Sequence, residues 1–208
     1  MQYFDVRDRD ESVRLFDELD PSLIVDVDVV GDVDQRDLRK IGEGCCDFTI
    51  ANHVIEHLAN PIALVEDMFY ITKPGGLVVL SAPDKRFTYD KKRDITPFQH
   101  LLEDYWNRET RADDSHYLDF IRKVLPGGEE KEGKALEDLL TLVWKRREHV
   151  HVWTTRSFRG FMFGALDHLG IQAEPIVELD GDDTRFEYFS IWQKAESGFI
   201  PSLLSACR

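Results

Sequence analysis

Residues 53–57 have the sequence HVIEH and combine two imidazoles with a carboxylate. The spacing H-x-x-E-H occurs in inverted zinc proteases, where two imidazoles one helical turn apart bind zinc and a carboxylate activates the bound water. Here the motif directly follows an apolar run, and Pro61 comes four residues after His57, so a long helix that holds both imidazoles is not expected. We therefore predict a loop at the end of a strand and no bound metal, with a zinc hydrolase as the weaker alternative.

Polar side chains also stand where three predicted strands end, namely at Asp5, at Asp28 and at Asn52 with His53. In open α/β sheets, ligands bind at the carboxyl ends of the parallel strands. An aspartate at such an end can accept hydrogen bonds from both hydroxyls of a ribose. Asp5 has a second interpretation of equal weight, as the cap of the helix that follows it.

A charged and aromatic run, DKRFTYD at residues 84–90, follows the next predicted strand. Arg86, Asp90, Arg93 and His100 could line a pocket for an acceptor molecule. The alternative for this basic and acidic stretch is a solvated surface, which is the more common role of such runs.

His149 and His151 alternate on a probable strand, so their side chains are expected to face the same way. A metal pair is one interpretation, and a hydrogen-bonded structural role is the favoured one. The sequence has neither a G-x-S-x-G nor a Walker A motif. Gly75 and Gly76 follow a predicted helix, so we expect them to end that helix rather than to cradle a phosphate.

The elements that position these residues alternate between strand and helix. Apolar periodicity and β-branched content predict strands at 2–6, 23–30, 45–51 and 77–82, and helices at 8–19 and 61–71. Asn60-Pro61 is the expected cap and first turn of the second helix. The unit from 45 to 82 is strand, helix and strand, which predicts a right-handed crossover between parallel strands.

Residues 83–148 interrupt this alternation with a charged segment in which we predict helices near 96–107, 113–125 and 129–147. The segment is expected to be an insertion on one side of the sheet. A helix at 154–169 then precedes two strands, 171–179 and 185–193, whose connecting turn at 180–183 predicts an antiparallel hairpin.

Composition limits the class of protein. The 208 residues include 26 Lys and Arg against 40 Asp and Glu, which gives a net charge of −14 and disfavours nucleic-acid partners. No apolar run approaches the roughly 20 residues needed to cross a bilayer, so no membrane contact is expected. Three cysteines without a C-x-x-C pair indicate a reducing compartment, the cytoplasm. We predict one α/β domain at 1–195, with the helical insertion at 85–148, and a C-terminal tail at 196–208.

Several of these motifs resemble one family. The run DFTIANHVIEHL at 47–58, Asn60-Pro61, and KPGG at 73–76 before an apolar strand resemble class I S-adenosylmethionine-dependent methyltransferases, more narrowly the type 11 methyltransferase domain. Residues 83–90 and 149–154 look like a bacterial subgroup linked to sugar and cell-surface glycan pathways. The resemblance implies a Rossmann-like sheet of strand order 3-2-1-4-5-7-6, the cofactor S-adenosylmethionine, and methyl transfer to a small molecule or a sugar or glycan intermediate.

The resemblance also assigns roles to individual residues. It implies cofactor contacts at five positions: Asp5, Asp28, Val29, Asn52 and His53. Candidate catalytic bases are His53, His57, Asp84 and His100. The segment after the fifth strand of the family would form a lid over the acceptor, with acceptor contacts from Arg86, Tyr89, Asp90 and Arg93.

One departure from the family concerns its first strand and glycine-rich turn, which should precede Met1. That strand lies at the centre of the family's sheet, and the turn lets the backbone approach the cofactor. We therefore expect a sheet that is incomplete at its N-terminal side and weak or absent cofactor binding. Relative to the family, the chain would then be truncated. Movement of strand 2, a partner that supplies a strand, or preceding sequence could fill the gap. An exposed strand edge also predicts a homo-oligomer. The alternative function is a catalytically inactive, methyltransferase-like interaction or regulatory protein.

Overall fold

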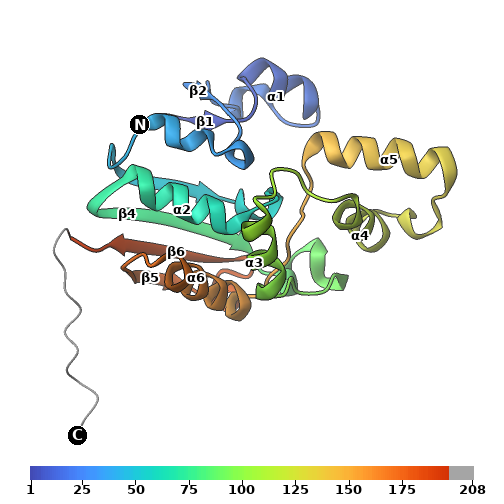
Figure 1. Cartoon of the computed structure of the whole chain (residues 1–208). Coiled ribbons are helices and arrows are strands. Elements are labelled where there is room, and N and C mark those ends of the chain that lie inside the picture. The colour runs from blue at the N-terminus through green and yellow to red at the C-terminus, as the bar shows by residue number, and fades with distance from the viewer. Residues whose placement is uncertain (197–208) are drawn as a thin grey trace, which may run out of the picture.

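A computed structural model describes residues 1–196 (Figure 1). Its helices are α1 (Arg9–Leu15), α2 (Pro61–Ile71), α3 (Phe98–Asn107), α4 (Asp114–Val124), α5 (Gly133–Arg146), α6 (Thr155–Leu169) and α7 (Gly181–Thr184). Its strands are β1 (Phe4–Asp5), β2 (Val29–Val30), β3 (Cys46–Asn52), β4 (Thr72–Pro83), β5 (Ala173–Leu179) and β6 (Glu187–Lys194). The predicted C-terminal tail lies, beyond residue 196, outside the described residues. None of the described helices is long and apolar enough to cross a membrane.

The central sheet has four strands in the order β3-β4-β6-β5. β3 and β4 are parallel and are connected through α2, as the strand–helix–strand pattern predicts. β6 pairs antiparallel with both β4 and β5, which confirms the predicted hairpin. The molecule is thus a mixed α/β fold of the Rossmann-like type, in agreement with the expected class.

α2 and α6 cover one face of this sheet (Figure 1). Under them lies the main core, in which inward-facing strand residues such as Leu80 and Trp192 pack against Phe69 and Met162 of the two helices. α2 begins where predicted, because the Asn60 side chain accepts a hydrogen bond from the Ala63 N–H at 3.0 Å and Pro61 occupies the first helical position. Local capping signals therefore place this helix correctly over the sheet.

The opposite face of the sheet carries an exposed apolar row. Ile50, Val79, Ile191 and Val177 are neighbours across the four strands, so their side chains point to the same side. Ile50 is 51% exposed and Val177 is 38% exposed. Phe48, two residues before Ile50, is also exposed, at 46%. We call this row together with Phe48 the open sheet face.

The N-terminal region forms a separate, two-stranded parallel sheet of β1 and β2, beside α1 (Figure 1). Within the described part of the chain, β1 pairs with β2 and not with β3, so strand 2 of the family pattern has not moved to fill the central gap. The predicted strand at 23–30 is wrong over most of its length. Only Val29–Val30 form a strand, and residues 21–23 form a 3-10 turn.

The helical segment between β4 and α6 divides into two parts. α3 packs on the main core through Leu101 and Phe98. α4 and α5 instead enclose a second, smaller core that is centred on Tyr117, Phe120 and Val143. The predicted insertion is therefore helical, but its first helix belongs to the layer that covers the sheet.

The glycine pair differs from expectation. α2 ends at Ile71 and β4 begins at Thr72, so Gly75 and Gly76 lie in the bulged start of a strand and not in a helix cap. A Cβ atom on Gly76 would lie 2.7 Å from the Asp47 carbonyl oxygen, because β3 and β4 approach closely there. The glycines thus serve strand packing at the start of β4.

Candidate functional site

The HVIEH motif lies at the carboxyl end of β3, where the chain turns sharply. His53 has a left-handed φ of 52°, and residues 55–57 form a single 3-10 turn. This turn directs the Glu56 side chain inward, where it is 1% exposed. Neither carboxylate oxygen of Glu56 has a hydrogen-bond partner among the described residues. Burying a carboxylate without hydrogen-bond partners is costly, so Glu56 is a candidate functional group.

Three imidazoles surround this carboxylate. From Glu56 Oε1, the distances are 3.4 Å to His53 Nδ1, 3.8 Å to His57 Nε2 and 3.8 Å to His149 Nε2. His149 reaches the motif because the Glu56 backbone carbonyl accepts hydrogen bonds from the N–H groups of Val150 and His151. We call Glu56, His53, His57 and His149 the Glu56 cluster.

The far nitrogens of these imidazoles are held by other groups. The Arg147 carbonyl accepts a hydrogen bond from His57 Nδ1. His149 Nδ1 lies 2.6 Å from Asp90 Oδ2, and His53 Nε2 lies 2.6 Å from Glu187 Oε2. Because a carbonyl can only accept, His57 carries its proton on Nδ1 and presents a lone pair on Nε2 toward Glu56.

The pKa directions agree with this arrangement. The close approach of the Glu56 carboxylate, together with Glu187, raises the pKa of His53, although burial acts in the opposite direction. Burial lowers the pKa of His57 and outweighs the attraction of Glu56. His57 is therefore neutral near pH 7 and can accept a proton, whereas the neighbouring carboxylates stabilise the protonated form of His53.

Tyr89, Asp90 and Arg93 support the cluster from one side. The Tyr89 hydroxyl lies 2.8 Å from His149 Nε2. Tyr89 is 51% exposed, so it can still contact a ligand. Asp90 and Arg93 are 2% exposed and pair with each other at 3.1 Å. Arg93 also donates to the His149 and Val150 carbonyls. The two residues thus fix segment 149–151. The sequence-based prediction placed them on an acceptor pocket, but in the structure both are buried.

Asp84 and Arg86 lie in another network. Asp84 is buried and accepts hydrogen bonds from Arg86 and from the N–H and hydroxyl of Thr155. Burial alone would raise the Asp84 pKa, but these donors lower it to about 2. Such a carboxylate is a poor base, which disfavours the predicted catalytic role. Arg86 bridges Asp84 and Asp182, so it links the end of β4 to the β5–β6 connection.

The predicted cofactor residues already hold hydrogen bonds within the chain. Asp28 Oδ2 accepts from the Tyr3 N–H at 2.7 Å, and Asp5 Oδ1 accepts from the Arg7 N–H at 3.0 Å. The helix cap considered for Asp5 is in fact formed by Asp8. Asp5, Asp28 and Asn52 are exposed, and Val29 lies in β2. Both aspartates keep a free oxygen, so a ribose contact remains compatible with their positions.

His100, the remaining predicted base, is in a different cluster, with His116 and His151. The two imidazoles of the H-x-H pattern therefore go to separate groups, and His149 and His151 do not form one pair. Segment 149–152 is extended but is not part of a sheet. His149 reaches the Glu56 cluster by tertiary folding, and no signal in the sequence connects HVH with the HVIEH motif.

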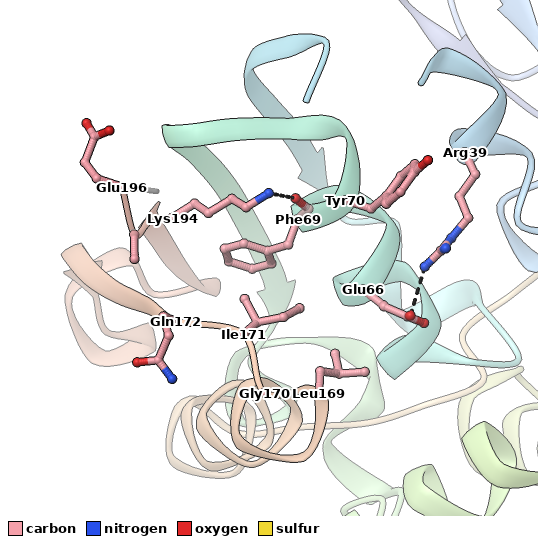
Figure 2. Close-up of a pocket in the computed structure, with 11 residues that line it drawn as sticks. Arg39, Glu66, Phe69, Tyr70, Leu169, Gly170, Ile171, Gln172, Lys194 and Glu196 are labelled. Carbon is pink, nitrogen blue, oxygen red and sulfur yellow. Dashed lines mark hydrogen bonds and ion pairs between the residues drawn. The ribbon is translucent and has the colours of Figure 1, made fainter. Parts of the chain in front are cut away.

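A cavity of about 470 Å³ lies at the opposite end of the sheet (Figure 2). Phe69 and Ile171 lie on its apolar side, and an ion pair of Arg39 with Glu66 lies at its other edge (Figure 2). Lys194 Nζ donates to the Phe69 and Thr72 carbonyls at 2.7 and 2.8 Å, so it satisfies the C-terminal end of α2. None of the predicted site residues lines this cavity. It is a structural feature of the helix–strand junction.

The Glu56 cluster is also able to hold a cation. Glu56, His57 and His149 each offer one ligand atom, and these three atoms lie within 4.8 Å of one another. Metal-binding imidazoles usually donate their other N–H to a carbonyl or carboxylate, as His57 and His149 do here. The cluster therefore has two chemical capacities, proton acceptance and divalent cation binding.

Comparison with known proteins gives a family match over most of the chain. The sequence profile of a family described as "Methyltransferase domain" matches residues 12–163. A search of curated proteins finds no match.

The solved structures that this chain resembles are similar to it at low sequence identity. A Rhodobacter sphaeroides protein named as a Zn-dependent alcohol dehydrogenase is 13% identical, with a TM-score of 0.53 over 92% of this chain and 73% of that chain. An O-methyltransferase family protein from Burkholderia thailandensis is 14% identical, with a TM-score of 0.43 over 95% of this chain and 44% of its own. A Bacillus halodurans protein named as a methyltransferase is 12% identical, with a TM-score of 0.40 over 92% and 80%.

Proposed function

Because the chain belongs to the methyltransferase domain family, we propose that it transfers a methyl group from S-adenosylmethionine to a hydroxyl of a small molecule or of a sugar or glycan intermediate. The family match supports the reaction class. The observation that supports a hydroxyl acceptor is the Glu56 cluster, where a buried carboxylate without partners faces a neutral imidazole. The cytoplasm remains the proposed compartment, and Cys45 and Cys46 are free thiols in the structure.

In the proposed reaction, the acceptor hydroxyl lies between the Glu56 cluster and the sulfonium methyl group. The hydroxyl proton passes to His57 Nε2, and the adjacent Glu56 carboxylate stabilises the imidazolium that forms. The acceptor oxygen attacks the methyl carbon in line with the breaking carbon–sulfur bond, and S-adenosylhomocysteine leaves. A divalent cation on Glu56, His57 and His149 would supply the same activation by lowering the pKa of the hydroxyl.

The cofactor would extend from the cluster toward the N-terminal region, with Asn52 and His53 beside the methionine part and with Asp5, Asp28 and Val29 beside the nucleoside. Weak cofactor binding is part of the proposal. The Asp5 and Asp28 carboxylates already accept backbone hydrogen bonds, and among the described residues no strand lies between β1 and β3. These two features also favour the second candidate function, an inactive interaction or regulatory protein.

The zinc hydrolase alternative has no comparable support. That chemistry needs both imidazoles of the motif on one metal, with the carboxylate free to act as a base. In this structure His53 Nε2 is bonded to Glu187, and His53 Nδ1 faces Glu56 itself.

The first test is calorimetric titration of the chain with S-adenosylmethionine and S-adenosylhomocysteine. A dissociation constant in the low micromolar range would contradict the inactive alternative. The second test follows S-adenosylhomocysteine formation with a panel of sugar nucleotides and glycan fragments, in the presence and absence of a chelator. Loss of turnover on chelation, with recovery on adding Mg²⁺ or Mn²⁺, would assign activation to a cation at the cluster.

Substitution separates catalysis from folding. Glu56→Gln is expected to lower turnover by about 10²–10⁴-fold, because the amide neither stabilises an imidazolium nor binds a cation well. Cofactor affinity should stay unchanged. Glu137→Gln, on the exposed surface of α5, is the matched control and should keep full activity. Full activity of the Glu56→Gln variant would refute the proposed role of the cluster.

A further inference from the structure

A second histidine cluster lies outside the proposed reaction site. It joins His100 of α3, His116 of α4 and His151 of the extended segment after α5, and their ligand atoms all lie within 4.8 Å of one another. The Nε2 atoms of His100 and His116 face each other at 3.2 Å. The ring of His151 is centred 5.7 Å from that of His100 and 5.2 Å from that of His116.

His151 is the unexplained member of this group. It is 1% exposed, and neither of its ring nitrogens has a hydrogen-bond partner among the described residues. The backbone of Ala59 lies near the ring, but without the geometry of a hydrogen bond. A neutral imidazole always carries one N–H and one lone pair, so burying both without partners destabilises the fold unless something else binds them. A hydrogen bond between His100 and His116 does not provide a partner for either ring nitrogen of His151.

Asp104 offers a fourth possible metal ligand. It follows His100 by one helical turn of α3, and its Oδ2 atom lies 3.3 Å from His100 Nε2. That oxygen is buried and makes no hydrogen bond of normal geometry with the described residues. Two atoms that bind one tetrahedral zinc at about 2.0–2.1 Å are about 3.4 Å apart. The separations of 3.2 Å and 3.3 Å from His100 Nε2 are close to that edge length. Asp104 lies outside the group of three histidines whose ligand atoms are all within 4.8 Å of one another, so its side chain must rotate toward His116 and His151 to become the fourth ligand.

We propose that His100, His116, His151 and Asp104 form a tetrahedral site for a divalent transition metal, zinc before others. Three imidazoles and one carboxylate suit zinc and its neighbours, whereas magnesium and calcium prefer oxygen ligands. The metal would fasten α3 and α4 to segment 149–151, which also carries His149 of the Glu56 cluster. The site is independent of the proposed reaction, because it uses none of the residues of the Glu56 cluster.

The surroundings of the cluster are consistent with cation entry. A cavity of about 590 Å³ reaches His100, His116 and Asp104 from the surface. Its wall carries Glu109, Asp113 and Asp114, against a single Arg111, so the local potential favours a cation. Burial lowers the pKa of His116 and of His151, so both rings are neutral near pH 7 and ready to bind a metal. This conclusion differs from the sequence-based expectation of no metal.

The test uses the full chain, freed of metal by a chelator and then titrated with Zn²⁺ or Co²⁺. We expect one zinc per chain at this cluster, and a rise in Tm of about 5–10 °C when zinc exceeds its Kd by 100-fold. Bound Co²⁺ should show the intense visible absorption of tetrahedral coordination. No binding at micromolar zinc, or a weak octahedral cobalt spectrum, would overturn the proposal.

Variants then assign the site. His116→Ala should weaken zinc binding by at least about 100-fold, more than the loss of an outer-shell partner costs. The matched control is His168→Ala, an exposed histidine of α6, which should bind zinc like the wild type. Glu56→Gln should also keep this zinc, since a loss there would place the metal in the Glu56 cluster instead.

Asp104→Asn preserves the shape of the site, so it covers the case in which His116→Ala does not fold. We expect it to weaken zinc binding while the circular dichroism spectrum stays unchanged. Zinc affinity equal to that of the wild type in both the His116 and Asp104 variants would refute the site.

Discussion

At the scale of single residues, Asp34 ties the N-terminal region to the loop that carries the candidate site. It is 8% exposed and accepts a hydrogen bond from the Ala59 N–H at 2.9 Å. Its ionic partner is Arg147, whose Nη1 atom lies 3.6 Å from Asp34 Oδ2. Burial is the dominant influence and raises the pKa of Asp34 to about 6, although Arg147 acts in the opposite direction.

This raised pKa predicts a pH dependence of stability. The folded chain holds the Asp34 proton more tightly than the unfolded chain, whose aspartates have a pKa of about 3.9. The resulting stabilisation is complete below about pH 4 and is lost as the pH rises through about 6. Asp34→Asn removes this titration and keeps an acceptor for Ala59. The difference between the free energies of unfolding, variant minus wild type, should therefore increase from pH 4 to pH 7 by at most about 3 kcal/mol.

Urea unfolding at pH 4, 5, 6 and 7 measures this difference. Asp183→Asn, at an exposed aspartate of α7, is the control and should show a constant difference across the series. A constant difference for Asp34→Asn as well would mean that Asp34 is an ordinary carboxylate in the folded chain.

Residue chemistry was only partly predictable from the sequence. The HVIEH motif drew attention to His53 and His57, because the motif is local, and the structure places both imidazoles beside the buried Glu56. The partners that shape the site, His149 and Glu187, lie 93 and 131 residues after Glu56 in the sequence, and no spacing rule connects them. Arg93 and Asp90 were expected on a pocket. In the folded chain Arg93 instead donates to the His149 and Val150 carbonyls, and Asp90 accepts a hydrogen bond from Arg93. Only the folded chain reveals these partners.

At the scale of elements, the junction of α2 and α3 depends on Asn60. Its Oδ1 atom caps α2, and its Nδ2 atom donates to the Asp104 carbonyl of α3 at 3.2 Å. We expect Asn60→Ala to lower the free energy of unfolding by about 1–2 kcal/mol, since it removes both the N-cap of α2 and the hydrogen bond to the Asp104 carbonyl. Equilibrium urea unfolding provides the measurement.

Asn107→Ala is a matched substitution for that experiment. Asn107 is the exposed last residue of α3, so its replacement should change the free energy of unfolding by less than about 0.5 kcal/mol. Equal effects of the two substitutions would show that the cap of α2 contributes nothing specific.

Elements with local signals were predicted well, and those that need distant partners were not. α2 was placed correctly at 61–71 by its cap and first-turn proline. The β-branched run at 23–30 looked like a full strand, but its neighbour β1 has only two residues, so only Val29 and Val30 find ladder partners. The predicted insertion was helical as expected, yet the packing of α3 on the main core depends on contacts that sequence periodicity does not reveal.

At the scale of the whole molecule, the open sheet face and the edge of β3 predict self-association. Apolar rows that span four strands are normally covered by helices or by another sheet. We expect the chain to have a mass above that of one copy in light scattering at tens of micromolar. Ile50→Lys places a charge on both the face and the edge strand, so it should shift the population toward the monomer.

Leu23→Lys is the control for this experiment, because Leu23 is 77% exposed but lies in the N-terminal region away from the open sheet face. It should leave the mass unchanged. A wild-type chain that remains monomeric at these concentrations would show that the exposed row does not mediate self-association.

The two unequal cores described above also bear on how the molecule opens. The core between α4 and α5 is much smaller than the one under α2 and α6, so less burial opposes its local unfolding. Amide protons of α4 and α5 should then exchange with solvent through local unfolding. Those of the central sheet should exchange more slowly, through global unfolding. Solvent access to His116 and to segment 149–151 would then depend on local unfolding of α4 and α5, which is faster than global unfolding of the chain.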